Sequence, residues 1–258
     1  MVASFYPLAW AAQRIGSETV SVHNLTRPGT EPHDVELSPR DVARVRAADV
    51  VLYLGGGFQP AVEDAVKGAS GTIVDLLAHQ QLARTAESEG GLTEDPHIWL
   101  DPVRYAAVVR RIGHALGRPR QAEKLAAPLD ELDREYARGL AHCRRREIVT
   151  THAAFGYLAR RYHLRQIPIT GLSPEAEPTP RDLESVVERV RASRATTVFF
   201  ETLVSPRLAD TVARETGART AVLDPLEGLS QEELDRGADY LSVMRENLAA
   251  LRRALDCR

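Results

Sequence analysis

Four side chains that can bind a metal ion lie after predicted strands or in the loops that follow them. They are the imidazoles of His33, His97 and His152 and the carboxylate of Asp224. Open α/β sheets bind their ligands beyond the carboxyl ends of the strands. Two of the four residues come from each half of the chain. If the halves face one another across a cleft, three nitrogens and one oxygen converge, which is the donor set of a tetrahedral metal site.

The residues by themselves leave a second interpretation open. A single histidine near a strand end is more often a hydrogen-bonded packing residue than a metal ligand. Asp224 precedes Pro225, and aspartate is common at such strand-to-turn junctions because its carboxylate accepts backbone hydrogen bonds. The remaining histidines lie within predicted strands or on predicted helices and are given no role: His23, His79, His114, His142 and His163.

Composition excludes several classes of protein. The chain has 258 residues, of which 43% are hydrophobic and 27% are charged, as expected for a globular protein. A net charge of -3 provides no overall attraction for nucleic acid or for anionic lipid. No apolar run approaches the roughly 20 residues of a membrane-spanning helix. Cys143 and Cys257 allow one pairing and form no CxxC motif.

Short strands and short helices alternate in the first third of the chain. The clearest helix start is at Ser38, Pro39 and Asp41, which supply an N-cap, a proline in the first turn and an acidic residue. The predicted order is strand 2–6, helix 8–15, strand 19–25, helix from 38, strand 49–54, helix from 60 and strand 72–74.

The middle of the chain is predicted to be helical. Strand signals vanish between about residues 101 and 146, and apolar side chains recur there at spacings of three and four. Pro128 should kink the second of two helices or delay its start. We expect a rigid connecting helix over residues 118–145, between an N-terminal lobe at 1–117 and a C-terminal lobe at 146–258.

The alternation of strands and helices returns in the last part of the chain. We expect strands at 147–151, 165–170, 196–200 and 219–223, helices from 153, 180 and 206, and a closing helix over 231–255. The predicted fold class is therefore α/β, with two lobes of βα units, mostly parallel sheets and helices on both faces.

Several motifs in order resemble the cluster A-I solute-binding proteins, which are the zinc and manganese receptors (ZnuA/TroA type) of bacterial ABC importers. The resemblance extends over essentially the whole chain. Its motifs are Ser4-Phe5-Tyr6-Pro7, Pro32-His33-Asp34 with Leu37-Ser38-Pro39, Asp95 to Pro102, Thr151 to Tyr157, Phe199-Phe200-Glu201 with Ser205-Pro206, and Leu223 to Leu226.

The resemblance implies two lobes joined by a rigid helix, with the metal in the cleft between them. His33 and His97 would be the ligands from the N-terminal lobe, and His152 and Asp224 those from the C-terminal lobe. Zinc receptors of this family tend to carry histidine at the third position, and manganese receptors glutamate. His152 therefore favours Zn²⁺ over Mn²⁺ as the transported ion, in keeping with the preference of Zn²⁺ for imidazole nitrogen.

The acids near the ligands are expected to accept hydrogen bonds from the imidazoles; they are Asp34, Asp95 and Glu201. In some relatives a glutamate directly before the first ligand approaches the metal. Here Pro32 stands at that position and Glu31 is one residue further away. This difference favours Asp224 over a glutamate as the fourth ligand. Residues 86–95 contain no histidine, so no auxiliary zinc capture is expected there.

The function implied is that of a receptor rather than an enzyme. It would capture a divalent metal ion outside the cytoplasmic membrane and deliver it to an importer permease. We expect a monomer in the periplasm, or a lipoprotein anchored to the outer face of the membrane, with its leader removed upstream of residue 1. That setting would permit a disulfide between Cys143 and Cys257.

Other functions remain open at this stage. The nearest alternatives are a manganese or iron receptor of the same family and a receptor for a metal chelate such as a siderophore or corrinoid. An adhesion role is sometimes attached to the family. A zinc-dependent hydrolase is disfavoured because the sequence has no HExxH, GxSxG or P-loop motif.

Overall fold

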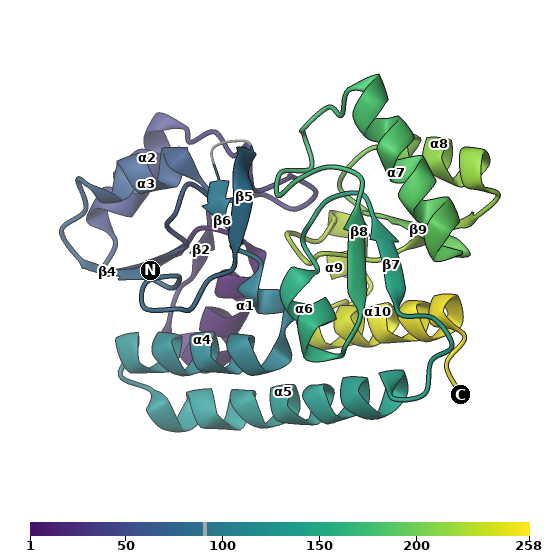
Figure 1. Ribbon diagram of the computed structural model, residues 1–258. Coiled ribbons are helices and arrows are strands. Elements are labelled where there is room, and N and C mark those ends of the chain that lie inside the picture. Colours follow the sequence, from purple (N-terminus) through teal and green to yellow (C-terminus); the bar gives the residue numbers. More distant parts are fainter. Residues whose placement is uncertain (90–91) are drawn as a thin grey trace.

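Two parallel sheets, one in each half of the chain, form the centre of the fold. The computed structural model describes residues 1–89 and 92–258. The first sheet has the order β2-β1-β3-β4 and the second the order β10-β9-β7-β8 (Figure 1). The strands are β1 (Val2–Ala3), β2 (His23–Asn24), β3 (Val50–Tyr53), β4 (Thr72–Asp75), β7 (Glu147–Thr150), β8 (Arg165–Pro168), β9 (Thr197–Phe200) and β10 (Arg219–Val222). The predicted α/β class with two lobes is confirmed.

Helices connect the strands close to the predicted positions, although the helix predicted from residue 153 begins at Gly156 and the one predicted from residue 8 begins at Tyr6. The helix after Ser38 begins at Pro39, and its capping box is complete because Ser38 and Asp41 each accept the other's backbone N–H at 3.2 Å. The connecting helices are α1 (Tyr6–Gly16), α2 (Pro39–Ala47), α3 (Pro60–Val66), α6 (Gly156–Arg161), α7 (Pro180–Ser193) and α8 (Arg207–Thr216), with short 3-10 turns η1 (Ser17–Thr19) and η2 (Ile98–Leu100).

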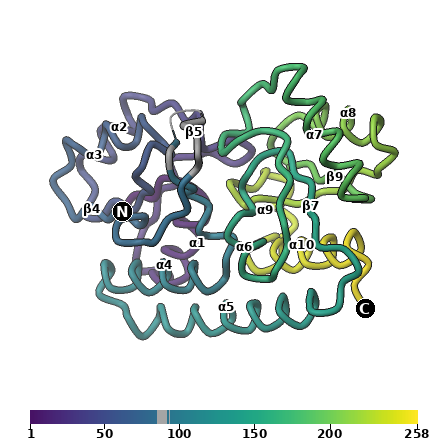
Figure 2. Tube along the Cα trace, viewed as in Figure 1, coloured from purple at the N-terminus to yellow at the C-terminus, as the bar shows by residue number. Residues whose placement is uncertain are grey.

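A layer of long helices underlies both halves. Helices α4 (Pro102–Ala115) and α5 (Pro119–Leu140) lie side by side, and α5 extends beneath both sheets and contacts α10 (Tyr240–Leu255) (Figures 1 and 2). Pro128 lies inside α5, which begins at Pro119, so the predicted delay of the helix start is wrong. The exact lobe boundaries at residues 117 and 145 remain a prediction.

One apolar core is continuous through the two halves and the base. It includes Phe5 beside the first sheet, Leu132 in α5, Phe155 beside the second sheet and Tyr240 at the start of α10, each no more than 1% exposed. Because side chains from both halves pack into the same core, the lobes rest on a common rigid base.

The structure also departs from the sequence prediction at the closing helix and between β4 and η2. The closing helix is divided into α9 (Gln231–Asp235) and α10, because Gly237 takes a left-handed φ of 78° and Asp239 caps a new helix. An antiparallel hairpin of β5 (Arg84–Glu89) and β6 (Leu92–Glu94) was not predicted. The hairpin overlaps residues 86–95, where the sequence predicts no auxiliary zinc capture. Residues 90 and 91 of that stretch lie outside the described part of the chain.

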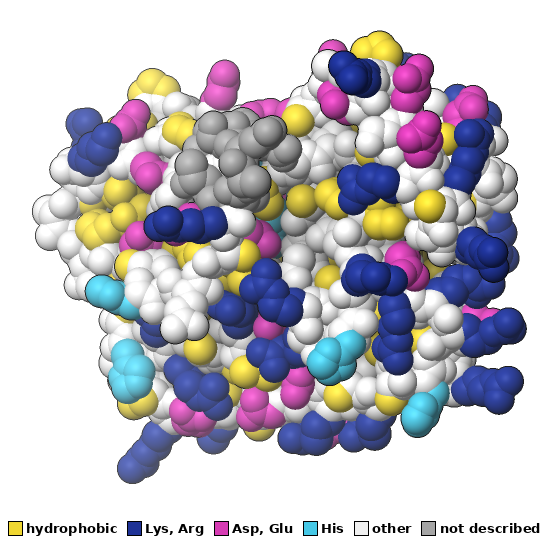
Figure 3. All heavy atoms as spheres, viewed as in Figure 1, with side chains coloured by type: hydrophobic (Ala, Val, Ile, Leu, Met, Phe, Trp, Pro, Cys, Tyr) yellow, Lys and Arg dark blue, Asp and Glu magenta, His cyan; other side chains and the backbone are white. Residues whose placement is uncertain are grey.

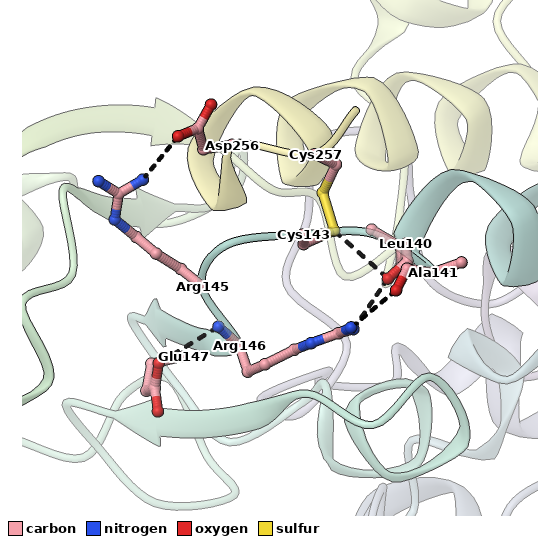
Figure 4. The surroundings of a disulfide bond; sticks show 8 residues. All are labelled: Leu140, Ala141, Cys143, Arg145, Arg146, Glu147, Asp256 and Cys257. Atoms are coloured by element: carbon pink, nitrogen blue, oxygen red, sulfur yellow. Dashed lines mark hydrogen bonds and ion pairs between the residues drawn. A yellow bond between two sulfur atoms is a disulfide. The ribbon is translucent and has the colours of Figure 1, made fainter.

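The two cysteines form a disulfide. Cys143 follows α5 and Cys257 follows α10, so the bond joins the ends of two helices of the base (Figure 4). The Arg146 side chain contacts the end of α5 beside this disulfide, where it donates to the carbonyl oxygens of Leu140 at 2.8 Å and Ala141 at 2.9 Å. The pairing permitted by the sequence is thus present in the structure.

The visible surface mixes charges of both signs. In Figure 3, arginine and lysine side chains are interspersed with aspartate and glutamate over the base helices and the two lobes. Among the residues whose exposure is described, the exposed large hydrophobic side chains are Val103 and Val222. None of the described helices combines the length and apolar character that crossing a bilayer requires.

Candidate metal centre

Three histidines from separate loops converge between the two halves. His33 lies between β2 and α2, His97 precedes η2, and His152 follows β7. The Nε2 atoms of the three rings lie 3.3, 3.2 and 3.2 Å, respectively, from Oε1 of Glu227. The Nε2 atoms of His97 and His152 are 3.3 Å apart. The structure therefore brings together the three predicted histidines, with Glu227 as the fourth member.

The spacing of the four donor atoms fits a small ion with four ligands. Around an ion whose donors lie at about 2.0–2.1 Å, the donors of a tetrahedron are about 3.3–3.4 Å apart. The four donor separations given above are 3.2–3.3 Å, and all donor atoms of the cluster lie within 4.8 Å of one another. The residues are at most 8% exposed, so bulk water contributes little to the coordination of an ion held there.

Two carboxylates behind the cluster orient the rings. Nδ1 of His97 lies 2.8 Å from Oδ1 of Asp95, and Nδ1 of His152 lies 2.7 Å from Oε1 of Glu201. A carboxylate at Nδ1 keeps a proton there and leaves the Nε2 lone pair directed into the cluster. Asp95 and Glu201 thus lie where the sequence predicts them, against the ligand imidazoles.

The buried carboxylates and imidazoles of the cluster shift one another's pKa values. Burial alone lowers the pKa of His97 and His152, but the neighbouring carboxylates outweigh burial and raise both pKa values. Burial alone raises the pKa of Glu227, but the three imidazoles outweigh it and hold that pKa well below its usual range. Glu227 is therefore ionised and supplies a negative charge at the centre of the cluster.

Asp224 does not belong to this cluster, which corrects the predicted fourth position. Its carboxylate accepts hydrogen bonds from Leu226 N at 2.6 Å and from Thr202 Oγ1 at 3.1 Å. Asp224 thus serves the strand-to-turn role that the sequence left open. The chain then turns through Leu226, whose φ of 55° is left-handed, and brings Glu227 to the histidines.

Asp34 also differs from the prediction that it accepts a hydrogen bond from a ligand imidazole. It is exposed, and its carboxylate lies within 4.8 Å of those of Glu31 and Glu175 rather than against a histidine ring. Glu31 instead accepts a hydrogen bond from the backbone N–H of His33 at 2.8 Å. Burial and the charge of Glu227 raise the pKa of Glu31 to about 9. The acid near the first histidine therefore supports its backbone and does not orient its ring.

Replacing Asp224 by asparagine is expected to change how stability depends on pH. Burial raises the pKa of Asp224 to about 7, against about 3.9 in an unfolded chain. The folded state therefore binds this proton more tightly, and the stability linked to it is lost as pH rises from about 4 to 7. The asparagine variant lacks this loss, so its stability relative to the parent should rise by on the order of 2 kcal/mol between pH 5 and pH 8.

Urea denaturation of the metal-free parent and variant at both pH values measures this difference. Asparagine keeps the oxygen that accepts from Leu226 N, so the turn is retained. An equal stability difference at pH 5 and pH 8 would contradict the raised pKa.

Comparison with known proteins identifies the family. The family model for ZnuA, described as the zinc-uptake complex component A, periplasmic, matches residues 1–254. The chain belongs to this family. The resemblance drawn from the sequence motifs is thereby confirmed.

Relatives in the ZnuA family are similar over nearly the whole chain. The zinc-binding lipoprotein AdcA of Streptococcus pneumoniae R6 is 34% identical over 278 residues, covering 99% of this chain and 56% of AdcA. The chain thus spans about half the length of the AdcA relatives that it matches. The high-affinity zinc uptake system protein ZnuA of Bacillus subtilis is 32% identical, covering 99% of this chain and 87% of that protein.

Solved structures of similar proteins share the fold. The Zn(II)-bound ZnuA-like domain of S. pneumoniae AdcA superposes with a TM-score of 0.81 and 36% identity, covering 99% of this chain and 98% of that one. The laminin-binding protein Lmb of Streptococcus agalactiae, described as an adhesin with metal-transporting activity, gives a TM-score of 0.88 and 29% identity, with 98% of each chain covered.

Proposed function

We propose that this chain is a receptor that captures Zn²⁺ between its two lobes and delivers it to the permease of an ABC importer. The observation that carries the proposal is the buried cluster of three imidazole Nε2 atoms around Oε1 of Glu227. The ligands would be His33, His97, His152 and Glu227. Membership of the ZnuA family and the zinc-binding names of the relatives support this proposal.

The donor set favours zinc over manganese. Zn²⁺ accepts a tetrahedral site rich in imidazole, whereas Mn²⁺ is better served by more oxygen donors. Three neutral imidazoles and one carboxylate leave a bound Zn²⁺ with one net positive charge. Asp95 and Glu201 at the outer sides of two rings offset that charge. A manganese or iron receptor of the same family is the alternative that a metal series would reveal.

Capture fits the site better than catalysis. Catalytic zinc keeps one position for water or substrate, whereas four protein donors close a tetrahedral sphere. A metal chelate would need a cavity open enough to admit it, and the four side chains are at most 8% exposed. The geometry therefore supports a receptor for the bare ion over a zinc hydrolase or a siderophore receptor.

The same proposal places the chain outside the cytoplasmic membrane, either free in the periplasm or anchored as a lipoprotein. The family description and the lipoprotein name of AdcA support this location. We further propose that the receptor acts as a monomer. Large contiguous apolar patches mark protein–protein contact sites, whereas among the residues whose exposure is described the exposed large hydrophobics are the separate side chains Val103 and Val222.

Zinc titration of the chelator-stripped protein against a chromophoric competitor tests the function. We expect one tight zinc site per chain and weaker competition by Mn²⁺, because imidazole nitrogen dominates the donor set. Zinc should also raise the melting temperature, since it binds the folded state alone. Absence of a tight site for any divalent ion would overturn the proposal, and tighter binding of Mn²⁺ would move the assignment to the manganese receptors.

A further inference from the structure

A tyrosine hydroxyl from one half of the molecule replaces a backbone hydrogen bond in the other half. Asp95 N donates directly to Ala83 O at 2.9 Å, at the base of the β5–β6 hairpin. The reciprocal bond is relayed by Tyr157, whose hydroxyl accepts from Ala83 N and donates to Asp95 O, both at 2.9 Å. Tyr157 stands in α6, beside the second sheet, whereas the hairpin lies with the first (Figure 1).

This arrangement departs from an ordinary antiparallel pair in one respect. Two residues of a hydrogen-bonded pair normally exchange both of their N–H···O bonds directly. At Ala83 and Asp95 one bond is direct and the other passes through the inserted hydroxyl. Burial raises the pKa of Tyr157 to about 12, so the hydroxyl keeps its proton and can donate and accept at once.

The Tyr157 side chain is held from two further directions. The guanidinium of Arg104, on α4, lies 4.4 Å from the centre of the tyrosine ring, in cation–π contact. Directly before Tyr157, a Cβ added to Gly156 would lie 3.0 Å from Oδ2 of Asp95. The start of α6 therefore approaches Asp95 closely, which a residue with a side chain would hinder.

Asp95 connects this contact to the metal cluster. Its Oδ1 lies 3.0 Å from the backbone N of His97 and 2.8 Å from Nδ1 of the same ring. The position of the Asp95 backbone therefore decides where the His97 ring lies and which tautomer it takes. Tyr157 itself does not belong to the cluster.

We propose that Tyr157 is a positioning residue, whose hydroxyl fixes Asp95 from the opposite lobe and thereby holds His97 in its metal-binding geometry. The proposal rests on the proposed function and adds a residue that acts through a neighbour. It also links the two lobes at the site, because α6 of one lobe completes the hairpin base of the other.

The test compares the hydroxyl deletion Tyr157→Phe with the matched deletion Tyr162→Phe. Tyr162 lies at the end of the same helix, is buried, and donates to Asp133 at 3.0 Å, outside the metal cluster. Zinc release into excess chelator should become up to about 10-fold faster in Tyr157→Phe, the lower end of the range for loss of a group that bonds a ligand directly, because Tyr157 acts through Asp95. Tyr162→Phe should release zinc at the parental rate.

Amide exchange measured by NMR separates positioning from general destabilisation. In Tyr157→Phe the amides of Ala83 and His97 should exchange faster in the metal-free protein, whereas the amide of Ile169, bonded to Thr150 in the second sheet, should keep its parental rate. Parental exchange at Ala83 and His97, or parental zinc release from Tyr157→Phe, would overturn the proposal. Should the parent bind no zinc, the exchange rates alone decide whether Tyr157 holds Asp95 and His97, while the proposed function fails separately.

Discussion

Zinc binding is expected to weaken by more than about 100-fold when Glu227 is replaced by glutamine. The substitution keeps the size of the side chain but removes its negative charge. In the parent, Oε1 of Glu227 lies 3.2–3.3 Å from all three Nε2 atoms. Loss of a carboxylate that only orients a ligand costs about 10- to 100-fold, and a direct ligand should cost more. Competition with a chromophoric chelator at neutral pH measures the ratio of the two dissociation constants.

Asp224→Asn is the matched control for this prediction. It makes the same change from carboxylate to amide, three residues away in the same turn, at a side chain bonded to Leu226 and Thr202. We expect its zinc affinity to remain within a few-fold of the parent. The reverse pattern, with strong loss in Asp224→Asn and little in Glu227→Gln, would restore Asp224 as the ligand.

The second large effect is expected on stability, when Cys143 and Cys257 are both replaced by serine. The bond joins residues 114 positions apart. In the chain-entropy model, a loop of that length stabilises the fold by about 4 to 5 kcal/mol at most. For a protein of this size each kcal/mol corresponds to about 2–4 °C, so the melting temperature should fall by roughly 10 °C.

Thermal and urea unfolding of the metal-free proteins measure the loss. The parent treated with a thiol reductant should approach the variant, and the variant itself should not respond to reductant. Zinc affinity should be unchanged, because the bond lies at the ends of α5 and α10 (Figure 4) and its cysteines do not belong to the metal cluster. A variant as stable as the oxidised parent would contradict the prediction.

The sequence was most informative where the physical signal is local. Proline in the first turn and an N-cap at Ser38 predicted the start of α2 correctly, because the capping box forms within four residues. The three histidines were found because each stands in a recognisable short motif and lies in a segment that follows a strand. Glu227 was missed because its position depends on the left-handed turn at Leu226, which leaves no clear mark in the sequence. The nearest available sign was its place directly after the motif that ends at Leu226.

The β5–β6 hairpin was missed because its local sequence carries only a weak strand signal. Residues 84–94 include three glutamates and two glycines but no valine, isoleucine or aromatic residue, so strong strand formers are few there. The pairing depends on contacts distant in sequence, such as the Tyr157 hydroxyl at the hairpin base. Gly237 and Asp239, by contrast, were readable signs of the break between α9 and α10 that the sequence prediction did not use.

The continuous apolar core has a consequence for how the molecule folds. Phe5, Leu132, Phe155 and Tyr240 are all buried in one cluster, so neither half retains a complete interior when it is separated from the other. The two sheets thus share one interior rather than forming two modules joined by a tether. An ion bound between the halves should therefore also stabilise the shared base, because it binds only the folded state.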